Sequence, residues 1–186
     1  DWIIPRLPRL RREASAAAAA KKFIFAAAEI SALYAAAGGV QWPLRFAGGG
    51  RCGDPGAWWR AYLVCGWHYG FRPQEFWSYE PGAAAITWAG VAWEPETEID
   101  LRSVASEHGW LRWTAQKRGH ELVLPMNAVV RRHLQALWDS LPAARRKPEK
   151  RIWDFPLACG TRKPRQTTTP ASGWYAAWWD LVERAG

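Results

Sequence analysis

The chain has 186 residues, 49% of them hydrophobic and 23% charged, which is enough for one domain with a buried core and excludes an intrinsically disordered chain. Its formal net charge of +8 favours nucleic acid as a partner, because phosphate pairing and counterion release both reward Lys and Arg, although a compositional bias toward Arg would explain the charge equally well.

The apolar stretch 16–37 is interrupted by charged residues, so we expect no membrane partner and no secretory signal. Three widely spaced cysteines fit neither a disulfide framework nor a zinc site, which indicates a reducing, cytoplasmic setting.

Residues 1–22 are predicted to form a basic linker, and residues 23–186 a single domain. The linker is either a strap on the DNA backbone or a solvated tether. Because the chain does not begin with Met, we expect that upstream sequence has been lost. Within the domain, apolar positions over 25–37 have helical spacing, and Gly38-Gly39 predicts a left-handed end to that helix.

Two further helices are indicated by their capping residues. Asp54 is a typical N-cap and Pro55 suits the first helical turn, so we expect a helix from there to Gly70. A short helix should open at Pro73.

The middle of the chain is predicted to contain a β-hairpin. Residues 77–109 are rich in Pro, Gly and acidic side chains, which indicates an extended, loop-rich insertion. Residues 110–114 and 121–124 have strand character, and the residues between them fit a turn in which Gly119 supplies the permissive backbone.

The last part of the chain predicts two helices separated by basic loops. After Pro125 comes an amphipathic helix with an apolar stripe at Val130, Leu134, Leu137 and Leu141. A basic connector (145–151) and a basic, Thr-rich loop (161–169) follow, and then a helix over 174–185. The expected fold class is α+β, mainly α, with a small antiparallel sheet.

Several common chemistries are excluded by the absence of their motifs. The sequence has no Gly-x-Ser-x-Gly, no phosphate-binding Gly-rich loop and no His-Glu-x-x-His. The four histidines are scattered, so each is interpreted as a surface or satisfied core residue. The carboxylates within 94–100 do not have calcium-loop spacing, and we predict no metal site.

Two short segments carry the strongest functional signal. In 69–75, a helix ends at Gly, Arg72 follows two residues later, and Glu75 lies three residues beyond the Arg. In 116–125, Lys117 lies at a hairpin tip, with a Gly two residues after it and a Pro eight residues after it. In this order the segments resemble the two early active-site signatures of the tyrosine recombinase (phage integrase) family, and the resemblance extends from about Phe25 to Gly186.

The resemblance implies metal-independent, cofactor-free strand exchange on double-stranded DNA, and it allows a homo-oligomer on DNA. Arg72 would stabilise the charge on the pentacoordinate phosphate with its planar, bidentate guanidinium, and Glu75 would hold that guanidinium. Lys117 would protonate the leaving 5′ oxygen. Further candidates for DNA contact are Arg118, His120, Arg145, Arg162 and Lys163.

The family completes its site with a His-x-x-Arg segment and a nucleophilic Tyr. The chain ends before such residues, so we expect a truncated catalytic domain that is inactive alone, and we assign none of its five tyrosines as the nucleophile. The competing interpretations are an ordinary Arg72–Glu75 ion pair and a solvated Lys117. Two alternative functions also stay open: a non-catalytic DNA-binding module, and a basic, Trp-rich interaction domain unrelated to DNA.

Overall fold

The computed structural model describes residues 25–42, 53–71, 73–76, 85–95, 106–114, 119–153 and 170–186. The main helices are α2 (Ala27–Ala36), α3 (Pro55–Tyr69), α4 (Pro73–Phe76), α5 (Ala128–Ser140) and α6 (Pro170–Ala185). Short 3-10 helices are η1 (Ala37–Gly39), η2 (Trp88–Gly90) and η3 (Ala143–Arg145). The strands β1 (Val91–Ala92), β2 (Trp110–Thr114) and β3 (Glu121–Pro125) form one antiparallel sheet in the order β1-β2-β3. The α+β, mainly α, fold class is therefore confirmed.

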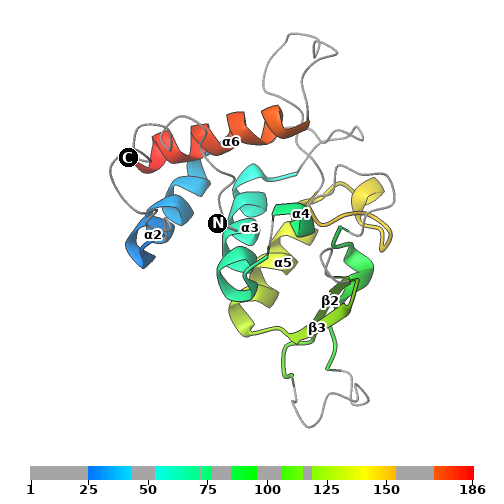
Figure 1. Ribbon diagram of the computed structural model, residues 1–186. Helices are drawn as coiled ribbons and strands as arrows, with labels where there is room; N and C mark the ends of the chain where they lie inside the picture. Colours follow the sequence, from blue (N-terminus) through cyan, green and yellow to red (C-terminus); the bar gives the residue numbers. More distant parts are fainter. Residues whose placement is uncertain are drawn as a thin grey trace.

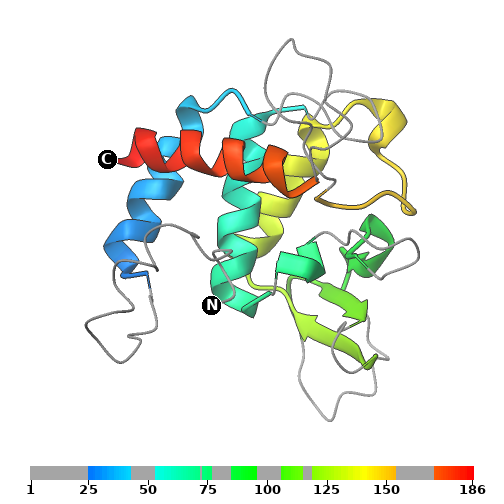
Figure 2. The ribbon, with the colours of Figure 1, turned by 45° about the horizontal axis from the view of Figure 1, so that its top comes forward.

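The helices pack against one another, and the sheet lies beside them. Helix α3 runs beside α5 in the centre, α2 packs against α6, and α6 crosses the amino-terminal end of α3 (Figures 1 and 2). The sheet lies at the other end of α3, next to α4 (Figures 1 and 2). This arrangement places the two segments with the recombinase-like motifs at the same end of the molecule.

Helix α3 has the ends that its sequence predicts. The Asp54 carboxylate accepts a hydrogen bond from the Gly56 N–H at 2.8 Å, and Pro55 occupies the first turn. Gly70 ends the helix in the left-handed conformation, with φ of 63°. Both caps are local to the sequence, which is why the pattern alone located this helix.

Helix α2 ends differently from the prediction. Gly38 and Gly39 do not adopt a left-handed cap; the chain instead tightens into η1 with right-handed backbone at Ala37. The Ala37 N–H donates to the Leu33 and Ala35 carbonyls, so the helix tightens into a 3-10 turn without positive φ at either glycine.

The insertion 77–109 contains a strand that the sequence analysis missed. Within its described residues, β1 pairs with β2 through Val91 opposite Leu111, directly after η2. The prediction of an extended, loop-rich stretch did not include this strand. A two-residue strand has too little alternation to be recognised, and its position depends on a partner strand distant in the chain.

Large aromatic rings form much of the core. Trp59 on α3 contacts the Trp174 and Trp178 rings of α6, with ring centroids 6.2 and 5.8 Å apart. Trp174 and Trp178 stack on each other at 5.3 Å. The predicted stripe is buried on α5 and its C-cap, and four aromatic rings near the sheet are also buried. The stripe residues are Val130, Leu134, Leu137 and Leu141, and the rings are Phe71, Phe76, Trp113 and Trp153.

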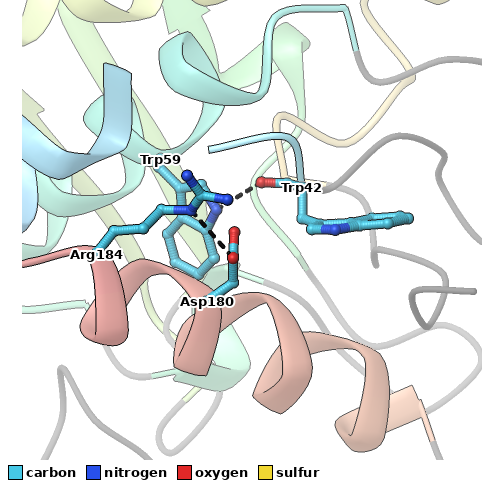
Figure 3. Close-up of polar contacts among 4 residues, drawn as sticks. All are labelled: Trp42, Trp59, Asp180 and Arg184. Atoms are coloured by element: carbon cyan, nitrogen blue, oxygen red, sulfur yellow. Dashed lines mark hydrogen bonds and ion pairs between the residues drawn. The ribbon is translucent and has the colours of Figure 1, made fainter. Parts of the chain in front are cut away.

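A hydrogen bond joins α3 to the segment after η1, and an ion pair forms within α6. The Trp59 indole N–H donates to the Trp42 carbonyl at 2.7 Å, and Arg184 pairs with Asp180 one turn earlier on α6 (Figure 3). The Arg184 side chain is 43% exposed, so this ion pair contributes little to stability. The buried indole bond is the stronger tether.

The linker 1–22 and the loop 161–169 lie outside the described residues. Among the described helices, none is long and apolar enough to cross a membrane. The Cys65 thiol is free and buried, and burial raises its pKa.

Candidate nucleic-acid interface

The segment that carries Arg72 is held on both sides by buried or helical residues. The chain leaves α3 at Gly70 and passes through Phe71, which is fully buried. It then enters α4 at Pro73. Arg72 itself lies outside the described residues, so its predicted phosphate-facing role stays a prediction.

Glu75 is placed on α4 and is only 8% exposed. A buried carboxylate is stable only with a charged or hydrogen-bonding partner, because desolvation of an unpaired charge is costly. Its backbone carbonyl accepts from the Ile86 N–H at 3.3 Å, which ties α4 to the chain leading into β1. This burial agrees equally with both predicted roles of Glu75, a support for the Arg72 guanidinium and an ordinary ion pair.

The predicted hairpin is confirmed. Strands β2 and β3 pair from Trp110 opposite Pro125 to Thr114 opposite Glu121. Gly119 has φ of 64°, as its turn position requires. Lys117 and Arg118 lie in the connection 115–118, outside the described residues, whereas His120 is described and exposed directly before β3.

The structure brings the α3–α4 turn and the hairpin into direct contact. The Phe71 ring meets the Trp113 ring of β2 edge to face, with centroids 4.7 Å apart. The Tyr69 hydroxyl donates to the Pro125 carbonyl at the end of β3, at 3.1 Å. The residues next to Arg72 and the two strands on either side of Lys117 therefore belong to one packed unit, although they are far apart in the sequence.

A cleft of about 550 Å³ opens beside the loop end of the paired strands β2 and β3. Its lining combines two guanidinium groups, two carboxylates and two threonine hydroxyls, contributed by Arg112, Arg151, Glu121, Glu149, Thr87 and Thr114. The connector reaches this cleft because the Trp88 and Ala89 N–H groups donate to carbonyls of Lys150 and Pro148, at 2.9 and 2.7 Å. The cleft can offer both hydrogen-bond donors and acceptors to a polar ligand.

The cleft was not found from the sequence. Arg112 alternates with the buried Leu111 and Trp113 along β2, so the period of two could have marked it as facing away from the core. Arg151 was recognised only as part of a basic connector. Arg145, a predicted DNA contact, is half-buried in η3 of the same connector, while Arg162 and Lys163 lie outside the described residues.

The positive charge is not spread evenly along the sequence. The segments 1–24, 115–118 and 154–169 carry formal net charges of +4, +2 and +2, which together equal the net charge of +8 of the chain.

The described tyrosine hydroxyls have core roles. Tyr34 is hydrogen-bonded to His133 at 2.6 Å, and Tyr69 to the Pro125 carbonyl. Burial, assisted by the nearby Cys65, raises the pKa of Tyr69, so its hydroxyl stays protonated and acts as a donor. Tyr62 is almost completely buried. Among the described residues, no group of three or more His, Cys, Asp or Glu could hold a metal ion.

Comparison with protein-family models, curated proteins and solved structures found no match to this chain.

Proposed function

We propose that this chain is part of a tyrosine recombinase catalytic domain and acts on the backbone of double-stranded DNA. In this proposal Arg72 stabilises negative charge at the scissile phosphate and Lys117 donates a proton to the leaving 5′ oxygen. Glu75 holds the Arg72 guanidinium from its buried position on α4. The nucleophile and the rest of the charge clamp are not assigned to residues of this sequence.

The observation that carries the proposal is the contact between the two motif-bearing segments. A pair of unrelated surface residues would not require their segments to share a core, but Phe71 packs edge to face on Trp113 at 4.7 Å. Catalysis on one phosphate requires the groups that contact it to be held together by rigid elements. The left-handed Gly70 and the paired strands β2 and β3 supply such elements.

The distribution of charge supports DNA as the ligand. Two of the segments with a net positive charge, 115–118 and 154–169, adjoin the hairpin and the connector in the sequence. Lys and Arg in such segments would pair with phosphates and release counterions. The same feature also fits the alternative of a non-catalytic DNA-binding module.

The test is the affinity of the chain for a fluorescein-labelled DNA duplex of mixed sequence, measured by anisotropy over a range of salt concentrations. We expect Arg72→Ala and Lys117→Ala each to weaken binding and to reduce the slope of log affinity against log salt by about 0.9. The matched control is Arg184→Ala, which removes the same charge from α6, away from the sheet (Figures 1 and 2). This variant should leave the slope unchanged.

The alternatives predict different results. Salt-sensitive binding that neither Arg72→Ala nor Lys117→Ala alters would support a DNA-binding module without these catalytic residues. A wild-type chain with no salt-sensitive affinity for DNA would refute both DNA-based functions and favour an interaction domain unrelated to DNA.

A further inference from the structure

Tyr69 connects the two motif-bearing segments directly. It is the last residue of α3, one residue before the left-handed Gly70. Its hydroxyl donates to the Pro125 carbonyl at 3.1 Å, across 56 positions of sequence. Its ring also contacts Phe71 and Trp113, with centroids 5.4 and 6.3 Å away.

The two ends of this hydrogen bond lie close in sequence to the two proposed catalytic residues. Arg72 follows Tyr69 by three residues, and Pro125 ends the strand that begins just after the hairpin connection containing Lys117. Pro125 is opposite Trp110 in the sheet, so a displacement of this strand end would be transmitted along paired residues toward the hairpin loop. A hydroxyl that fixes this carbonyl therefore fixes the hairpin relative to the end of α3.

We propose that Tyr69 is a positioning residue that sets the separation between the Arg72 turn and the Lys117 hairpin. This inference rests on the proposed function for its catalytic meaning, but its geometric content can be tested without DNA. The ring of Tyr69 provides packing, whereas its hydroxyl provides the directional restraint, because a hydrogen bond has a defined length and angle and a ring contact tolerates sliding.

The variant that separates these two roles is Tyr69→Phe, which removes one oxygen and keeps the ring contacts. Its matched control is Tyr34→Phe, which also removes a hydroxyl from a hydrogen bond, between α2 and α5, and leaves the turn and the hairpin untouched. Both changes remove a buried or partly buried hydroxyl, so thermal unfolding measures how far each acts through stability alone.

The first measurement is the distance between spin labels attached through Trp67→Cys on α3 and Glu121→Cys on β3, two exposed positions on the elements that the Tyr69–Pro125 hydrogen bond joins. The chain used has Cys52 and Cys159 replaced by Ser, and its Cys65 is buried. We expect one narrow distance distribution, which Tyr69→Phe broadens or shifts and Tyr34→Phe leaves unchanged. An identical distribution with and without the Tyr69 hydroxyl would overturn the positioning role, whatever the protein binds.

The second measurement is a double-mutant cycle for duplex affinity with Arg72→Ala and Lys117→Ala. If both side chains contact one phosphate, the loss of duplex affinity in the double variant should differ from the product of the two single losses. We expect this difference to be about tenfold in the parent chain and about twofold or less in the Tyr69→Phe background. Undiminished coupling would refute the positioning role and leave the proposed function intact. If neither single substitution weakens binding, the proposed function fails, and the label distances still decide whether Tyr69 positions the two segments.

Discussion

His133 provides a prediction about pH that can be worked out from its surroundings. Its side chain is buried on α5, where Nδ1 is 2.7 Å from the Val129 carbonyl and Nε2 is 2.6 Å from the Tyr34 hydroxyl. The carbonyl can only accept, so Nδ1 carries the proton and Nε2 accepts from Tyr34 in the neutral ring. Burial lowers the pKa of His133, and the positive charges of Arg132, Arg60 and His68 lower it further, against an opposing effect of the Val129 hydrogen bond.

The sign of the effect follows from the protons bound in each state. In the unfolded chain His133 titrates near its ordinary pKa of about 6.5, whereas the folded state resists protonation. Between these two values the unfolded state binds more protons, so stability is highest above about pH 6.5 and falls as the pH is lowered toward the folded pKa. From about pH 7.5 to 5.5 this residue can remove at most about 1.4 kcal/mol, equivalent to about 3–6 °C in Tm.

The assay is urea denaturation at several pH values, followed by the fluorescence of the fifteen tryptophans. The reference is His133→Gln, which keeps an acceptor for Tyr34 and does not titrate. The difference in unfolding free energy between the parent chain and this variant should change with pH in the stated direction. The same pH dependence in both proteins would refute the idea that burial depresses protonation of His133.

Three substitutions test the packing that positions the candidate site. Gly109→Ala should abolish the pairing of β1 with β2, because position 109 has φ of 84° and a Cβ there would lie 2.1 Å from the Ala92 carbonyl; a loss of more than about 2 kcal/mol in urea denaturation is expected. Leu137→Ala should cost about 2–5 kcal/mol in the same assay, because the side chain is fully buried between α5 and α3; a loss below about 1 kcal/mol would contradict that packing. Asn127→Ala should cost about 0.5–2 kcal/mol, because its side chain accepts from the Val130 N–H at 2.9 Å and caps α5; Asn127→Ser should recover most of this loss.

The features predicted correctly were those that depend on residues close together in the sequence. Asp54 and Gly70 mark the ends of α3, and Gly119 marks the turn of the hairpin, because each residue suits its own local backbone. The stripe on α5 repeats with the helical period, so its buried face could be read directly. His133 was expected to be a surface or satisfied core residue, and its two hydrogen bonds confirm the latter.

Other features depend on contacts between distant segments. The strand β1 exists because β2 lies beside it, and Gly109 must be small because the Ala92 carbonyl of β1 comes close to it. The cleft beside the hairpin combines residues of η2, the sheet and the connector, so no single stretch of sequence reveals it.

By itself, the sequence determined the helix and strand periods, the caps and the order of the two recombinase-like motifs, because these are properties of residues close together along the chain. The tertiary structure decided that those motifs meet. Phe71 packs on Trp113, and the Tyr69 hydroxyl bonds to the Pro125 carbonyl, through contacts between residues that lie more than 40 positions apart. Such contacts form only when the whole core is packed, which is why the candidate site could be suspected from its motifs but its assembly could not be derived from them.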